Sequence, residues 1–272
     1  MAIRMPVFAG SFYPDDARLL HSKVQQLLLD APTINLTAEL SDRPKISKAV
    51  IVPHAGYMYS GSTAATAFKS LLPQANAISR VILLGPSHRV PLLGIATPEL
   101  DLGDNDFLTP LGKVPLDAAA IAEIIAIEGV VMANGAHARE HSLEVQLPFL
   151  QQVLGDFNLV PLVVGQCAPS MVAKVLDTLW GDGESLIIIS SDLSHFHTYL
   201  QAQEIDRHTT GKIEALEFDL QAGEACGCYP LNGLLMLARH KGLEINTLTL
   251  CNSGDTAGNK NRVVGYGAYV LH

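Results

Sequence analysis

The chain has 272 residues, of which 48% are hydrophobic and 17% charged, which excludes a disordered chain and suits one large α/β domain. The formal net charge of −9, without a basic run, argues against a nucleic-acid partner. No apolar run is long enough for a membrane span, and the N-terminus carries no export signal. The 4 cysteines suit reduced thiols rather than a disulfide framework, so we expect a cytoplasmic protein without membrane association.

Short β-branched runs alternate with helical patterns along the chain. Four runs are apolar on both faces, as buried parallel strands are, at 48–53, 80–84, 157–164 and 185–191. Helices are expected at 62–72, 117–127, 142–154, 170–180, 200–216 and 231–240, with closing strands near 243–250 and 264–271. Residues 30–48 are expected to form a surface loop, and 98–112 an excursion at the rim of the sheet. The pattern predicts a single α/β domain over 1–272, with a mostly parallel central sheet covered by helices on both faces.

Polar residues follow three of the predicted strands directly. His54 follows the first run, His88 the second, and Asp192 and His195 the run at 185–191. The carboxyl ends of parallel strands meet at one edge of a sheet, where ligands bind. A single histidine in such a loop is usually just solvated, but several converging imidazoles are typical ligands of Zn, Cu and Fe. The spacing therefore favours a metal site at this edge.

The segment 226–230, which contains Cys226 and Cys228, is the candidate source of a third ligand. It precedes an apolar helix that has Pro230 in or near its first turn. A thiol just ahead of a helix N-terminus feels the positive end of the helix dipole, so we expect a lowered pKa and a thiolate suited to metal binding. The alternative is a small loop packed with free thiols.

Residues 137–144 contain the pattern H-x-x-E-H, the inverted zinc-peptidase signature. That chemistry needs both histidines on one helical face. The apolar periodicity starts only at Leu143, which predicts a helix beginning near Ser142 and leaves His137 in a loop. The interpretation we prefer is that three residues of this run line the pocket of the metal site, namely Glu140, His141 and Glu144.

Several motifs, in order along the chain, resemble the Memo (mediator of cell motility) family. The resemblance runs from about residue 6 to the C-terminus. It is carried by AGSFY at 9–13, PHAGY at 53–57, YSG at 59–61, GPSH at 85–88, EHSLE at 140–144, SSDLSH at 190–195 and C-G-x-x-P at 226–230.

The resemblance implies a fold related to the class III extradiol dioxygenases, which are non-haem iron enzymes that open catechol rings. It implies metal ligation by His54, His88 and Cys226. Beside the metal, it implies Asp192 and His195 as acid–base groups, with His141 and Tyr57 lining the cleft. We assign catalysis to His195, Asp192 and His141, and substrate contact to Tyr57, Glu140, Glu144 and Ser87.

The dioxygenases hold their metal with two histidines and a carboxylate, whereas a thiolate here would make a softer site. Fe(II) is the expected cofactor, with Cu or Zn as alternatives, in a dioxygenase-like metal-dependent oxidoreductase acting on a small molecule, phenolic or otherwise. One alternative is a non-catalytic module that binds a peptide or a partner protein, with a helix start at Gly61–Ser62 offering N–H groups to an anion. A zinc hydrolase using H-x-x-E-H is another. The resemblance also implies association with radical-SAM partner proteins.

Overall fold

The computed structural model describes residues 3–34, 46–103 and 105–272. Across this part of the chain, nine strands form the central sheet. They are β2 (Ala49–Val52), β3 (Arg80–Pro86), β4 (Ile95–Thr97), β7 (Val130–Met132), β8 (Asn158–Val164), β9 (Ser185–Ser190), β10 (His195–His197), β11 (Ile245–Asn252) and β12 (Val263–Leu271). Their order is β10-β12-β2-β9-β3-β8-β4-β7, and β11 pairs with β12.

The centre of this sheet is parallel and its flanks are mixed. Strands β2, β9, β3 and β8 run parallel, as their uniformly apolar sequences predict. Strand β12 is antiparallel to β2 and β11, and β4 is antiparallel to β8. The four central strands therefore bring their carboxyl ends to the same edge, and the predicted α/β class is confirmed.

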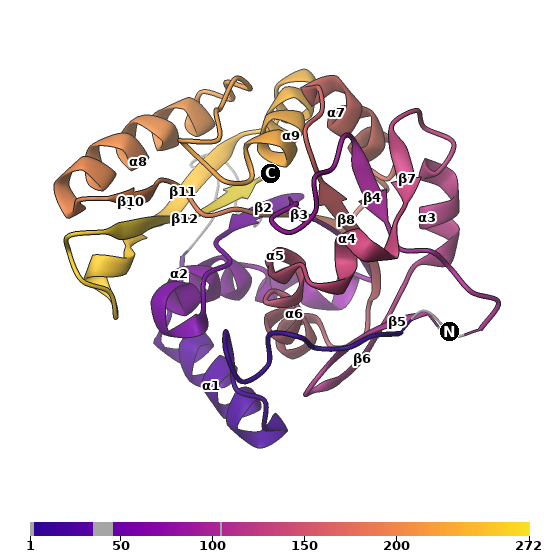
Figure 1. Ribbon diagram of the computed structural model, residues 1–272, viewed down its shortest axis with the longest axis horizontal. Helices are drawn as coiled ribbons and strands as arrows, with labels where there is room; N and C mark the ends of the chain where they lie inside the picture. Colours follow the sequence, from indigo (N-terminus) through magenta and orange to yellow (C-terminus); the bar gives the residue numbers. More distant parts are fainter. Residues whose placement is uncertain (1–2, 35–45, 104) are drawn as a thin grey trace.

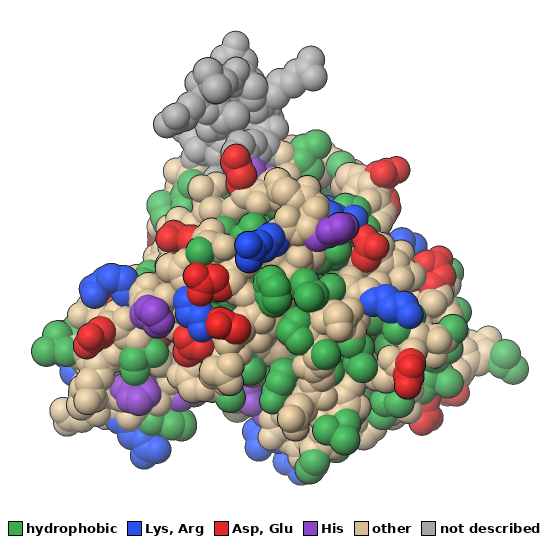
Figure 2. Space-filling model, turned by 90° about the horizontal axis from the view of Figure 1, so that it is seen from above, with side chains coloured by type: hydrophobic (Ala, Val, Ile, Leu, Met, Phe, Trp, Pro, Cys, Tyr) green, Lys and Arg blue, Asp and Glu red, His purple; other side chains and the backbone are tan. Residues whose placement is uncertain are grey.

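Helices cover both faces of the sheet (Figure 1). Those of one layer pack near β2, β11 and β12, and those of the other near β3, β8 and β9. The first layer contains α1 (Ala17–Asp30), α2 (Tyr57–Ser70), η1 (Leu72–Ala77) and α6 (Leu147–Leu154). The second contains α3 (Ala118–Ile124), α7 (Pro169–Thr178) and α9 (Cys228–Lys241), with α8 (Tyr199–Glu214) over β11 and β12. Figure 2 views the molecule from above, the side on which α7, α8 and α9 lie in Figure 1, and shows acidic and basic side chains interspersed on this face.

Three short helical segments complete the list: α4 (Asn134–Ala138), α5 (His141–Glu144) and η2 (Ser253–Asp255). The single helix expected at 142–154 is split into α5 and α6. Pro148 lies in the first turn of α6, and a proline at that point cannot donate a hydrogen bond to the carbonyl group four residues earlier. The break allows α5 to take its own direction at the sheet edge.

The excursion at 98–112 takes part in a second, three-stranded sheet. Its strands are β1 (Ile3–Arg4), β5 (Asp106–Thr109) and β6 (Gly112–Pro115), in the order β1-β5-β6. The loop expected at 30–48 falls largely on residues 35–45, which lie outside the described residues. Among the described helices, none combines the length and the apolarity that crossing a bilayer requires.

Candidate metal centre

Three imidazoles meet at the carboxyl edge of the sheet. His54 lies two residues after β2, His88 lies two residues after β3, and His141 is the first residue of α5. The ring centroids are 5.1 Å apart for His54 and His88, 5.3 Å for His54 and His141, and 4.6 Å for His88 and His141. Each ring offers a nitrogen atom within 4.8 Å of the nitrogen atoms of the other two. Imidazoles at this spacing can share one metal ion.

A serine fixes the tautomer of His54. The Ser190 hydroxyl donates to the carbonyl oxygen of Ser142 at 2.6 Å, and its oxygen accepts from Nε2 of Gln146 at 2.8 Å. Nδ1 of His54 lies 2.9 Å from the same oxygen and must be the donor, because the Ser190 proton is already used. The lone pair of His54 is therefore on Nε2, the atom directed away from Ser190.

A buried carboxylate performs the same task for His88. Glu140, only 1% exposed, accepts from Nδ1 of His88 at 2.9 Å and from the backbone N–H of His88 at 2.7 Å. It also accepts from the N–H of Ser142 at 2.9 Å and thereby caps α5. Burial alone would raise the pKa of Glu140, but the hydrogen bonds and charge of His88 outweigh it and lower the pKa to about 2. Because Nδ1 of His88 is hydrogen-bonded to Glu140, Nε2 is the atom of this ring that is left to bind a metal.

His54 and His141 favour the neutral form that metals bind. Burial, reinforced by His88, lowers the pKa of His54 well below its usual value. Burial, reinforced by His54 and His88, lowers the pKa of His141 to about 3. Because burial and the neighbouring rings disfavour a charge on these two side chains, both present unprotonated nitrogen atoms at neutral pH.

Cys226 contacts the cluster through His54, but the group of ligand atoms that lie within 4.8 Å of one another contains His141 and not this expected third ligand. Its Sγ lies 3.3 Å from Nε2 of His54, and the backbone N–H of Asp192 donates to the same sulfur at 3.3 Å. Two ligands of one tetrahedral zinc ion, with bonds of about 2.0 and 2.3 Å, lie roughly 3.5 Å apart, so the pair fits a shared ion. The lowered thiol pKa expected from the helix dipole is wrong: burial, reinforced by the Asp192 charge, raises the pKa of Cys226. A metal would therefore have to displace the thiol proton.

Asp192 and His195 are placed beside the cluster. Asp192 accepts from the backbone N–H of His54 at 2.8 Å, and its burial raises the pKa to about 6. Nδ1 of His195 lies 2.8 Å from the carbonyl oxygen of Leu193 and donates to it, which leaves a lone pair on Nε2. The tautomer of His195 is thus set by a backbone carbonyl.

Two glycines allow the elements of the site to approach closely. A Cβ atom at Gly85 would lie 2.5 Å from Oγ of Ser142, and one at Gly227 would lie 2.7 Å from Cβ of Ser191. The first contact brings α5 against the end of β3, and the second brings Cys226 against the end of β9. These glycines were not among the expected site residues, although both lie inside the quoted motifs.

Three residues assigned to substrate contact are committed to internal bonds. The Tyr57 hydroxyl donates to the carbonyl oxygen of Val145 at 2.7 Å, and both Tyr57 and Glu144 are buried. Ser87 donates to the carbonyl oxygen of Val90 at 2.6 Å. Glu144 accepts hydrogen bonds from the backbone of the N-terminal segment. These side chains shape the surroundings of the site; their hydrogen bonds leave them poorly suited to touching a substrate.

The H-x-x-E-H pattern does not form one helix. His137 lies in α4 rather than in the expected loop, and the chain breaks its helical course at Arg139 before α5 begins. His137 is buried, with Nε2 donating to the carbonyl oxygen of Ala96 at 3.1 Å. Its ring therefore does not share a helical face with His141, and the zinc-hydrolase alternative loses the geometry that it requires.

The anion site expected at Gly61–Ser62 is also wrong. Helix α2 begins at Tyr57, so residues 61 and 62 lie within it rather than at its start. Their backbone N–H groups fall beyond the first turn, where helix hydrogen bonds already occupy them. This observation removes the feature that favoured a non-catalytic binding module.

A model of the Memo-like protein family matches residues 4–270. The chain is 35% identical to a "MEMO1 family protein" of Ignicoccus hospitalis, over 98% of each chain. It is 32% identical to one of Sulfolobus acidocaldarius, over 97% of each chain. The crystal structure of an uncharacterized Escherichia coli K12 protein matches 80% of this chain and 98% of its own, with a TM-score of 0.50 and 13% identity, a likeness of fold alone. The chain belongs to the Memo-like family.

Proposed function

We propose that this protein is a metal-dependent oxidoreductase of the dioxygenase-like kind, acting on a small phenolic or related molecule. The observation that supports the proposal most strongly is the convergence of three imidazoles and one thiol at the carboxyl edge of the sheet. Two of the imidazoles, those of His54 and His88, have Nδ1 hydrogen-bonded to protein oxygens, so that Nε2 is the atom left to bind a metal, and in His54 it faces the Cys226 sulfur. This is how proteins prepare histidines to bind a metal.

The residues present fit a transition metal. His54 and His88, from the group of three histidines, would hold it together with Cys226, whose sulfur lies against His54, and His141 is the neighbouring nitrogen donor. Two imidazoles with a sulfur suit Fe(II), Cu or Zn, and we favour Fe(II) for oxygen chemistry. When bound, a redox-active ion would supply Lewis acidity and an electron couple.

The remaining work falls to groups of the chain itself. His195 is half-buried and has its free Nε2 available to accept a proton from a substrate hydroxyl. His88 and His141 are only partly covered, with side chains 27% and 14% exposed, so a small molecule can approach from their side. Asp192 accepts from the backbone N–H of His54, and its own backbone N–H donates to Sγ of Cys226, so it holds these two residues side by side.

Metal analysis tests the proposal, using protein loaded with Fe(II) under anaerobic, reducing conditions. We expect about one equivalent per chain, and less than about a tenth in His54→Ala, because that variant loses the central ligand. The matched control is His21→Ala, which removes an exposed histidine on α1. Oxygen uptake is then measured with a panel of phenols. Sub-stoichiometric metal that is the same in all three proteins would refute the metal centre; full metal without oxygen uptake would refute the oxidoreductase.

A further inference from the structure

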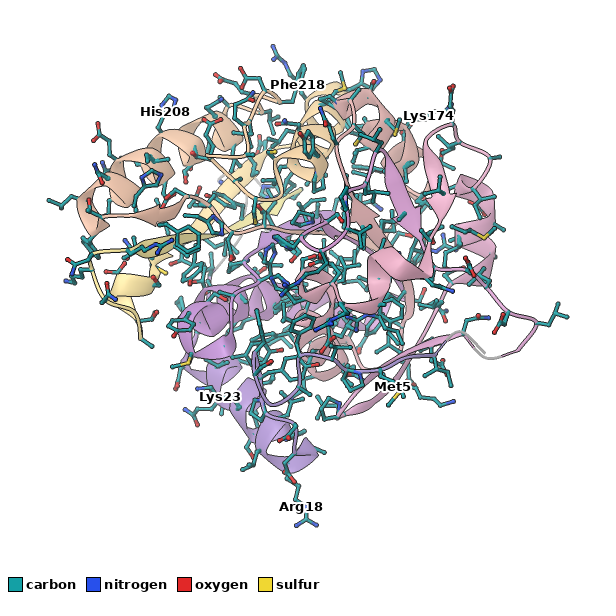
Figure 3. All side chains as sticks on the ribbon, in the orientation of Figure 1. Met5, Arg18, Lys23, Lys174, His208 and Phe218 are labelled. Carbon is teal, nitrogen blue, oxygen red and sulfur yellow. The ribbon has the colours of Figure 1, made fainter. Side chains whose placement is uncertain are left out.

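The segment before α1 crosses the molecule beneath α5 and α6 (Figure 1), and Met5, labelled in Figure 3, lies near its start. Its course brings it against the run 137–144, which carries His141. We propose that residues 4–13 form a strap that walls one side of the metal centre, with Arg4 and Glu144 as its positioning residues. This inference rests on the proposed metal site and assigns it a further structural requirement.

Glu144 is the anchor of the strap. Its carboxylate accepts from the backbone N–H of Val7 at 3.1 Å and of Phe8 at 2.8 Å, and from the Tyr13 hydroxyl at 2.5 Å. Arg4 pairs with the same carboxylate at 2.7 Å. Glu144 is fully buried, so these four donors compensate the loss of its hydration. One carboxylate thus gathers both ends of the segment.

Arg4 fastens the same run from its other side. Its Nε donates to the carbonyl oxygen of His137 and its Nη2 to that of Glu140, both at 2.7 Å. The planar guanidinium therefore bridges α4, the turn before α5, and the end of α5. That turn carries Glu140, which orients His88. The ion pair links the strap to both imidazoles on this side of the centre.

The strap places two aromatic rings on His141. The centroid of Phe12 lies 4.9 Å from that of His141, and the centroid of Phe8 lies 5.4 Å away. The two phenyl rings also touch each other edge to face at 5.2 Å. The imidazole of His141 is thus enclosed by the strap on one side and by His54 and His88 on the other. Loss of the strap would expose this ring and leave it free to turn.

Carbethoxylation by diethyl pyrocarbonate tests the strap without any metal, because the reagent labels accessible neutral imidazoles. We expect His141 in Glu144→Gln to be labelled at least about fivefold faster than in the wild type, because local opening exposes the ring. Phe12→Ala, at a half-buried position, should give the same direction and keeps the anchor intact. The control is Arg80→Met, which breaks a partly exposed ion pair at the opposite edge of the sheet and should leave the labelling rate unchanged.

Cobalt binding, followed by visible absorption, separates this inference from the proposed function. We expect an affinity for Co(II) about tenfold or more weaker in Glu144→Gln than in Arg80→Met, as for the loss of other groups that orient metal ligands. A wild type that binds no Co(II) would count against the metal centre, while the labelling rates would still decide the strap. Labelling of His141 within twofold of the wild-type rate in both Glu144→Gln and Phe12→Ala would overturn the strap.

Discussion

The two ends of the same central strands carry polar groups with different consequences. At the amino end of β2, Lys48 donates to the carbonyl oxygens of Trp180, Asp182 and Ser185, so its ammonium hydrogens are used within the protein. At the carboxyl ends, His54 and His88 contact protein oxygen atoms through Nδ1, and Nε2 of His54 faces the Cys226 sulfur of the same cluster. A buried polar group indicates a binding site when a donor or acceptor atom is left over and faces others of its kind. By that criterion the histidines at the carboxyl ends form a site, whereas Lys48 does not.

Replacing His88 should have the largest effect at the carboxyl end. His88→Ala removes one of the two oriented imidazoles, so we expect metal affinity to fall at least about a hundredfold. Competition with a chromogenic chelator measures it. Lys48→Met, at the amino end, should retain the wild-type affinity; equal losses in the two variants would mean that general destabilisation explains both.

Glu140 tests orientation alone. In Glu140→Gln the amide cannot accept from His88 Nδ1, the His88 N–H and the Ser142 N–H together, so metal affinity should fall about 10- to 100-fold. The same chelator titration applies. Asp117→Asn is the amino-end counterpart, since Asp117 pairs with Arg80 at 2.7 Å, and it should leave the affinity unchanged. An unaffected Glu140→Gln would show that the carboxylate does not prepare His88.

Lys48→Met tests whether the hydrogen bonds at the amino end stabilise the fold. The three carbonyl groups lose their shared donor, and we expect the free energy of unfolding to fall by about 1–3 kcal/mol. Urea unfolding monitored by circular dichroism measures the change. No loss of stability would mean that water replaces the ammonium group at no cost, and that the three hydrogen bonds of Lys48 do not stabilise the fold.

His137 gives a pH dependence of smaller size. Burial lowers its pKa to about 3, whereas the unfolded chain titrates near 6.5, so the unfolded state binds more protons between these values. Stability from this group is therefore complete above about pH 6.5 and is lost as the pH falls, by about 1–2 kcal/mol near pH 5. His137→Gln keeps a donor for Ala96 and should show a shallower loss in urea unfolding at the two pH values. Equal slopes would contradict a neutral, buried His137.

Strand runs and the residues that follow them were sufficient to predict the parallel centre of the sheet and the places of His54 and His88. The signal is local, because a run that is apolar on both faces must be buried and its exit must lie at the edge. Helix α1 carried a comparable signal, since Asp16 caps it through the N–H groups of Arg18 and Leu19, but it was not anticipated.

Other features depend on contacts between distant segments. The sequence shows Ser190 only as a small residue at the end of a strand, but its oxygen accepts hydrogen bonds from both His54 and Gln146. The raised pKa of Cys226 follows from burial beside Asp192, which no local pattern encodes. The motif that Glu144 shares with His141 predicts a pocket residue. Its bonds to the N-terminal segment, which hold that segment in place, depend on packing between distant parts of the chain.

X-ray absorption spectroscopy of the metal-loaded protein shows whether His54, His88 and Cys226 bind the same ion. With Co(II) or Fe(II) bound, we expect imidazole outer-shell scattering together with one sulfur neighbour at about 2.3 Å, a neighbour that is lost in Cys226→Ser. A spectrum with only light oxygen neighbours and no imidazole scattering would contradict this expectation, because the ion would then lie somewhere other than between His54, His88 and Cys226.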